Sequence, residues 1–199
     1  MSAQAERSDA PPVRDDDVVA MLMRQHGEIR NLFDEVESTT GEERKDAFRR
    51  LVRMLAVHET AEEEVVHPFA RKAFGDAGLG VAERLEEERL AKEKLSALED
   101  MDTEDAAFLP ALLELRVDVM EHARAEERYE FTHLRRSADP ERLAAMAKAV
   151  RAAEATAPTH PHPGVESGAK NMALGPMAAV MDRTRDAVRK AMGKDGGKG

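Results

Sequence analysis

The chain has 199 residues, of which 42% are hydrophobic and 35% charged, a composition too apolar for a disordered protein and typical of amphipathic helices. Aromatic residues make up only 4%, which disfavours β-sandwiches and barrels. The absence of cysteine excludes disulfides, thiolate metal sites, iron–sulfur clusters and cysteine nucleophiles. Thirty basic residues against forty acidic ones give a net charge of -10, which disfavours a broad surface for nucleic acid.

The N-terminal residues show no apolar segment of the kind that directs secretion, and the sequence contains no run of about 18 apolar residues. We therefore expect a cytoplasmic, soluble protein that does not contact a membrane. Residues 1–14 are polar and interrupted by proline, which predicts a disordered lead-in.

Four long helices are predicted next, because apolar residues recur at steps of three and four. The first helix follows the capping carboxylates of residues 15–17 and ends at the break formed by residues 39–41. Pro110 falls inside the fourth helix and predicts a kink or a separate first turn. The expected helices cover residues 18–37, 42–74, 81–99 and 103–136.

Short connections between long helices predict an all-α fold, an antiparallel up-down-up-down four-helix bundle with extra C-terminal helices. Asp139 and Pro140 form the cap and first position of a shorter fifth helix. The expected divisions are the bundle over 15–137, the fifth helix within 138–157, a Pro-rich linker over 158–175, an amphipathic helix over 176–192 and a flexible tail over 193–199.

Histidine or glutamate interrupts the apolar stripe of every long helix. The second and fourth helices each carry an H-x-x-x-E pair, whose members share one helix face and can hold the same cation. A buried carboxylate without a partner is costly, and a pair of divalent or trivalent cations would compensate for it. The six candidate metal ligands are His26, His58, Glu62, Glu88, His122 and Glu126.

An internal repeat supports this interpretation. The segment H-E-T-A-E-E-E from His58 is matched by H-A-R-A-E-E-R from His122, so two helical hairpins share one ligand pattern. The repeat fails in the third helix, where Glu88 stands in place of a histidine that would match His26. Glu88 lies in an acidic run, for which a solvated face is the alternative, and Glu87 is the fallback ligand.

Over roughly residues 15–137 the chain resembles hemerythrin-type cation-binding (HHE) domains, through the histidine of the first helix and the order of the two H-x-x-x-E pairs. The resemblance implies two non-haem iron ions, oxo- or hydroxo-bridged, and a small ligand such as O₂, NO or H₂O₂. Oxygen-carrying members have histidines on the helix of Glu88. The added carboxylate favours ferric iron, which shifts the expected chemistry from reversible oxygen carriage towards catalase-like peroxide decomposition, or towards sensing.

Tyr129 lies one turn beyond Glu126 and is interpreted as an iron ligand, as a hydrogen-bond partner of a bound ligand, or as an ordinary core tyrosine. The other histidines are not expected to bind the metals. His67 is expected to be structural, and His133 lies two turns past Glu126, too far to be a ligand. His160 and His162 are expected to belong to the Pro-rich linker.

Two functions are compatible with this pattern. The first is a redox di-iron enzyme that decomposes peroxide. The second is a module that binds or senses O₂, NO or iron and passes the change to a protein partner through the helix over 176–192. A metal-free bundle with a hydrogen-bonded polar layer is the third alternative, and manganese or zinc also accepts the same His/Glu set.

Overall fold

The structure is a computed structural model that describes residues 17–74, 81–160 and 175–193. The expected lead-in, the flexible tail after residue 193 and most of the linker, including His162, lie outside the described residues.

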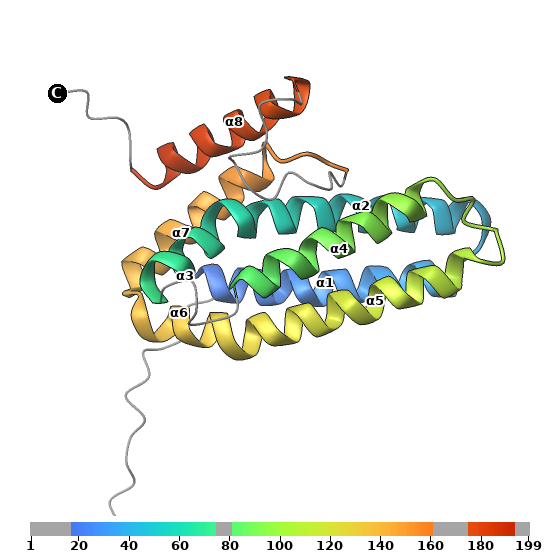
Figure 1. Ribbon diagram of the computed structural model, residues 1–199, viewed down its shortest axis with the longest axis horizontal. Coiled ribbons are helices and arrows are strands. Elements are labelled where there is room, and N and C mark those ends of the chain that lie inside the picture. The colour runs from blue at the N-terminus through green and yellow to red at the C-terminus, as the bar shows by residue number, and fades with distance from the viewer. Residues whose placement is uncertain (1–16, 75–80, 161–174, 194–199) are drawn as a thin grey trace, which may run out of the picture.

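Four long helices form the bundle predicted from the sequence (Figure 1). They are α1 (Val18–Ser38), α2 (Gly41–Ala61), α4 (Val81–Glu99) and α5 (Phe108–Ala125). The α1–α2 and α4–α5 connections lie at the same end of the bundle, as the up-down-up-down order requires. Two further helices follow, α7 (Pro140–Glu154) and α8 (Gly175–Ala191), so the all-α prediction with extra C-terminal helices is confirmed.

Local capping sets where these helices begin. The Asp17 side chain accepts a hydrogen bond from the Ala20 amide at 2.7 Å, and this caps α1. Residues 103–107 form turns and α5 begins at Phe108, so the fourth helix begins later than Thr103, and of the two alternatives predicted from Pro110 the structure has the separate first turn. Pro110 is the third residue of α5, where a missing N–H costs no intrahelical hydrogen bond.

Each H-x-x-x-E pair runs into a π-helical turn. The second long helix continues from α2 through η1 (Glu62–Val66) into α3 (His67–Phe74), and the fourth continues from α5 through η2 (Glu126–Glu130) into α6 (Phe131–Ser137). Both π turns begin at the glutamate of the motif, whose carbonyl accepts from the amide five residues later. Single π turns inside α-helices are rare and occur frequently at functional sites.

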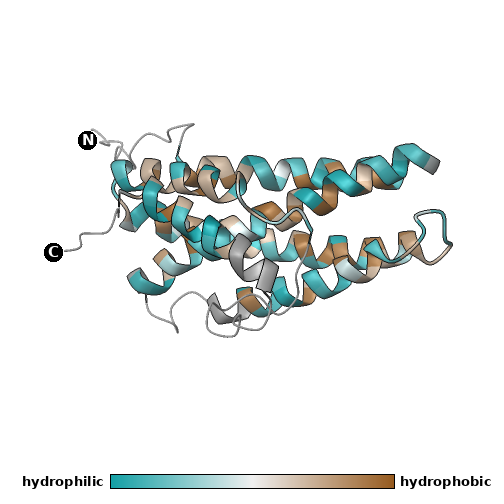
Figure 2. Ribbon diagram, turned by 90° about the horizontal axis from the view of Figure 1, so that it is seen from above, coloured by the Kyte–Doolittle hydropathy of each residue, from teal (hydrophilic) through white to brown (hydrophobic). Residues whose placement is uncertain are grey.

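The core consists of two apolar clusters with the His/Glu residues between them. One cluster includes Ile29, Leu55 and Val119, and the other includes Leu22, Val65 and Phe131. Along α1, His26 falls between the residues of the two clusters, and His122 and Glu126 do so along the fourth long helix. Figure 2 shows hydrophobic and hydrophilic segments alternating along the helices, as expected for amphipathic bundle helices.

The C-terminal helices cover the second apolar cluster. The inward side of α7 contributes Met146 and Val150, both fully buried. Helix α8 packs against α7 and η1, with Thr184 and Met181 buried. The described part of its apolar face is thus covered by the chain's own helices. No helix in the described part of the chain is long and apolar enough to span a bilayer.

Phe108 lies in the apolar cluster that includes Ile29, Leu55 and Val119. We expect Phe108→Ala to lower the free energy of unfolding by about 3–5 kcal/mol, because Phe108 is fully buried and packs edge-on against Phe48. Leu113→Ala, at a side chain that is 45% exposed, should change it by less than about 0.5 kcal/mol. Urea unfolding followed by circular dichroism measures both, and equal losses would contradict the assignment of the core.

Candidate metal centre

The structure brings all six candidate ligands together inside the bundle. They form two groups in which the potential ligand atoms all lie within 4.8 Å of one another. One group is His26, His58, Glu62 and Glu126, and the other is Glu62, Glu88, His122 and Glu126. Glu62 and Glu126 belong to both groups, as expected of carboxylates placed between two cations.

The distances between these groups suit ligands that surround a cation rather than direct hydrogen bonds. His58 Nε2 lies 3.3 Å from Glu62 Oε2, and His122 Nε2 lies 3.3 Å from Glu126 Oε1. His26 Nε2 lies 3.5 Å from the other oxygen of Glu126. The buried atoms of the layer without a hydrogen-bond partner among the described residues are His26 Nε2, His122 Nε2, Glu88 Oε2 and both carboxylate oxygens of Glu62 and Glu126.

Such orphaned atoms are costly in a folded protein, at about 1–3 kcal/mol each. Imidazole nitrogens and carboxylate oxygens are donors that iron, manganese and zinc accept. The donor set therefore fits a pair of these cations, and metal ligation would satisfy atoms that the protein itself leaves unpaired.

The opposite ring nitrogen of each candidate histidine is held from outside the layer. His26 Nδ1 lies 2.9 Å from Glu127 Oε1, and His122 Nδ1 lies 3.0 Å from Glu87 Oε2. His58 Nδ1 lies 2.8 Å from the amide oxygen of Gln25. A hydrogen bond at one nitrogen orients the ring and leaves the other nitrogen free for a metal. Glu87, the fallback ligand, thus orients His122 instead.

Burial and mutual charge set the ionisation of the layer. Burial, together with the neighbouring His26, lowers the pKa of His58 to about 3, so this imidazole is neutral at physiological pH. Burial and the neighbouring Glu126 carboxylate raise the pKa of Glu62 well above its usual range. Burial would also raise the pKa of Glu126, but the adjacent His122 and His26 together outweigh burial and hold that pKa well below the usual range.

A buried lysine stands beside the layer on α4. Lys92 is only 5% exposed, forms an ion pair with Glu63, and has its Nζ 3.9 Å from Glu59 Oε2. Burial raises the pKa of Glu59 to about 8 and that of Glu63 to about 7, against the lowering effect of Lys92. Lys92 therefore lowers the cost of ionising these two carboxyl groups, although burial keeps Glu59 largely protonated at neutral pH.

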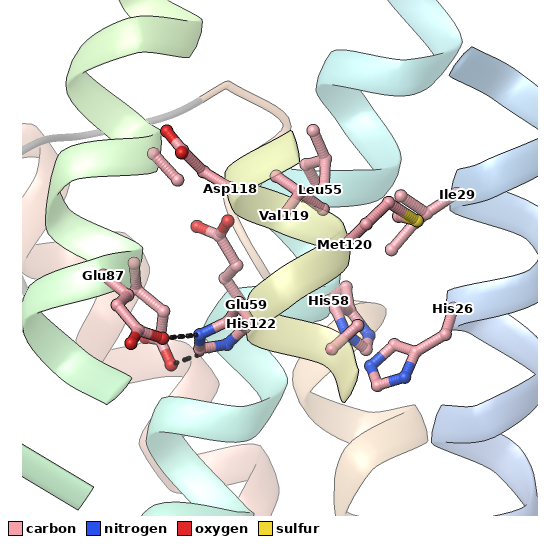
Figure 3. A pocket seen from close by; sticks show the side chains of 13 residues that line it. His26, Ile29, Leu55, His58, Glu59, Glu87, Asp118, Val119, Met120 and His122 are labelled. Carbon is pink, nitrogen blue, oxygen red and sulfur yellow. Dashed lines mark hydrogen bonds and ion pairs between the residues drawn. The ribbon is translucent and has the colours of Figure 1, made fainter. Parts of the chain in front are cut away.

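A small cavity adjoins the three histidines (Figure 3). The centre of a water-sized molecule can move within a volume of about 20 Å³ there, so the cavity has room for about one such molecule. Apolar side chains, among them Ile29 and Val119, line one part of it, and Glu59 lines another. The cavity therefore suits a ligand of very few atoms.

The structure corrects two predictions made from α-helical spacing. Tyr129 is 51% exposed and contacts the guanidinium of Arg128, so it neither reaches the layer nor forms part of the core. The π turn rotates it outward and places Glu130, which is 1% exposed, on the inner side. His67 is also turned inward, at the end of the other π turn, and is 2% exposed.

His67, expected from the sequence to be structural, joins the polar layer. Its Nε2 lies 2.5 Å from Glu88 Oε1 and its Nδ1 lies 3.2 Å from Glu130 Oε1. Burial alone would lower the pKa of His67, but the charges of Glu88 and Glu130 and the hydrogen bonds of His67 to their carboxylates together outweigh burial and raise that pKa well above the ordinary value. The ligand atoms of His67, Glu126 and Glu130 also lie within 4.8 Å of one another.

The remaining described histidines lie away from the layer. His133 Nδ1 contacts the backbone oxygen of Tyr129, and His160 is an exposed residue whose Nδ1 contacts Glu99 at 2.7 Å. Neither belongs to a group of potential metal ligands in the described part of the chain.

Comparison with known proteins identifies similar domains. The family model described as Hemerythrin HHE cation binding domain matches residues 17–134. An uncharacterized hemerythrin-like protein of Schizosaccharomyces pombe is 27% identical over 172 residues, which cover 85% of each chain. A DNA nickase of Nostoc is 26% identical over 154 residues, covering 77% of this chain and 42% of that protein.

One solved structure also matches, that of a hemerythrin HHE cation binding domain-containing protein from Mycobacterium kansasii. The TM-score is 0.59 at 17% identity, and the match covers 88% of this chain and 98% of the other. At this identity the likeness supports the fold alone.

The geometry predicts that cations stabilise the protein. At a free cation concentration 100-fold above its dissociation constant, the stabilisation is about 2.7 kcal/mol, which corresponds to a rise of about 5–10 °C in the melting temperature. Glu62→Gln should abolish this rise. It should leave the melting temperature of the metal-free protein nearly unchanged, because burial and the neighbouring Glu126 make a charge on Glu62 unfavourable for stability. Melting curves with iron, manganese and zinc, and with a chelator, test this. A wild-type melting temperature indifferent to all three metals would contradict it.

Proposed function

Because the chain belongs to the hemerythrin HHE cation-binding family, we propose that its buried His/Glu layer holds two iron ions and decomposes hydrogen peroxide. The observation that carries this proposal is the pair of shared carboxylates. Glu62 and Glu126 occur in both ligand groups, and all four of their oxygens lack hydrogen-bond partners among the described residues. Both carboxylates would therefore be shared between two cations, and the histidines would complete the ligand set on either side.

In this proposal His26 and His58 bind one iron, while Glu88 and His122 bind the other. When bound, iron supplies the electron exchange by which one peroxide and two protons become two waters, while a second peroxide becomes dioxygen and two protons. No external reductant is required. The carboxylate of Glu88 adds negative charge where a third-helix histidine would add none, and so stabilises ferric iron against the ferrous state that reversible oxygen carriage needs.

The surroundings of the cavity support a substrate as small as peroxide. Its limited room excludes larger organic molecules, and part of its wall is apolar. Glu59 lines the cavity, and its buried Oε2 has no hydrogen-bond partner among the described residues. With a pKa of about 8, raised by burial, this carboxyl retains its proton at neutral pH and can donate it in a hydrogen bond to a small ligand.

Metal analysis and peroxide turnover test the proposal together. We expect about two irons per chain. We also expect the rate of oxygen evolution from hydrogen peroxide to fall by at least about 100-fold in His58→Ala, because one of the metal ligands is lost. Tyr129→Phe is the matched control, since the exposed ring does not reach the layer, and should retain wild-type turnover. Protein loaded with two irons that leaves peroxide untouched would refute the enzyme and spare the metal site.

A second function is favoured by one contact of the C-terminal helix. Arg185 of α8 donates from Nε to both carboxylate oxygens of Glu64, at 3.1 and 3.3 Å. Glu64 lies in the π turn that also carries Glu62, so a change in coordination at Glu62 has a direct route to α8. This contact suits a module that senses O₂, NO or iron and signals by loosening or tightening that helix.

Hydrogen exchange distinguishes the sensor from the enzyme. We expect the amides of α8 to exchange at different rates in the oxidised and reduced iron-loaded protein if the helix reports the state of the centre. The difference should vanish in Arg185→Ala and persist in Lys190→Ala, at an exposed lysine of the same helix. Identical exchange in both oxidation states would rule out signalling through this helix.

A further inference from the structure

Helix α7 lies outside the matched family domain, yet one of its side chains belongs to the hydrogen-bond network of the metal layer. Glu154 accepts a hydrogen bond from Nε2 of Gln25, and Gln25 Oε1 lies 2.8 Å from His58 Nδ1. The opposite nitrogen of His58 lies 3.3 Å from Glu62. A residue 129 positions away from Gln25 in sequence is thus two hydrogen bonds from a candidate ligand.

The direction of this chain of hydrogen bonds is fixed by chemistry. An ionised carboxylate only accepts, so Glu154 makes the Gln25 amide turn its NH₂ group outward and its oxygen towards His58. The amide oxygen also only accepts, so the hydrogen of the neutral imidazole resides on Nδ1. Nε2 then keeps the lone pair that a metal ligand needs.

His58 is special among the three candidate histidines of the layer in needing such a third group. The Nδ1 atoms of His26 and His122 face carboxylates, Glu127 and Glu87, which are acceptors in any orientation. The Nδ1 of His58 faces an amide, which after rotation by half a turn would present NH₂ instead of oxygen. That rotated amide would favour the hydrogen on Nε2, and Nε2 would then have no lone pair with which to bind a metal in the layer.

We propose that Glu154 is a positioning residue that locks the tautomer of His58 and thereby sets the cation affinity of the His26–His58 half of the centre. The inference rests on the proposed metal-binding function. It gives helix α7 a role beyond covering the apolar cluster, because its last residue completes the hydrogen-bond network of the site.

The surroundings of Glu154 make the test practicable. Gln25 and Glu154 line the wall of a groove of about 810 Å³ between α1, α2 and α7, so a substitution at Glu154 does not disturb the apolar core. Glu28 lines the same groove, is exposed, and carries the same charge. Glu28→Gln is therefore a matched control for Glu154→Gln.

The primary readout needs no metal. In the metal-free protein at pH 7.5, two-bond ¹H–¹⁵N correlations of the labelled His58 ring report which nitrogen carries the hydrogen. We expect Nδ1–H alone in the wild type and in Glu28→Gln. In Glu154→Gln, which keeps the side-chain size, we expect both tautomers, because an amide at position 154 can accept or donate. A single Nδ1–H tautomer in Glu154→Gln would overturn the inference.

The second readout is the affinity for ferrous iron, measured by competition with a chelator. Glu154→Gln should weaken the binding of one of the two irons by about 10–100-fold, the usual effect on metal affinity of losing a hydrogen-bond partner of a metal ligand. The exchanged pair, Gln25→Glu with Glu154→Gln, should restore both the tautomer and the affinity, because a carboxylate at position 25 accepts in either orientation. Failure of this rescue would also overturn the inference. Absence of iron binding in the wild type would refute the proposed function and leave the tautomer result standing.

Discussion

The structure depends on how a layer of carboxylates and imidazoles is accommodated between two apolar clusters. Glu62 and Glu126 are fully buried, their oxygens lack hydrogen-bond partners among the described residues, and their pKa values are driven in opposite directions. Hydrophobic burial on both sides of the layer supplies the stability that tolerates such groups. A pair of cations would turn this unfavourable arrangement into a favourable one, which links the stability of the bundle to its function.

An internal repeat accounts for much of the architecture. Two helical hairpins each place a histidine and a glutamate one turn apart, and each glutamate starts a π turn. The two halves differ in what surrounds this shared frame. His67 follows the first π turn and pairs with Glu88, whereas Phe131 follows the second and stacks on the ring of His26. The first half therefore adds charge near the centre, and the second adds an apolar wall.

The helices, the bundle and the convergence of six polar residues could be predicted because a steady α-helical period places Leu22, His26 and Ile29 on one face. The same reasoning failed at Tyr129 and His67. Each π turn adds one residue to a helical turn, so the residues after it that face the bundle interior differ from those that an α-helical period predicts. No pattern in a single sequence indicates where a π turn occurs. The contact between Gln25 and Glu154 could not be predicted either, because it joins helices 129 residues apart whose packing depends on the whole fold.

The most direct test of the central idea is a crystal structure of protein purified from iron-replete cells, with anomalous diffraction measured on both sides of the iron absorption edge. Two iron peaks should lie between Glu62 and Glu126, one on the side of His26 and His58 and the other on the side of Glu88 and His122. A layer filled only by water, or closed by direct hydrogen bonds among these side chains in protein that retains no metal, would contradict it.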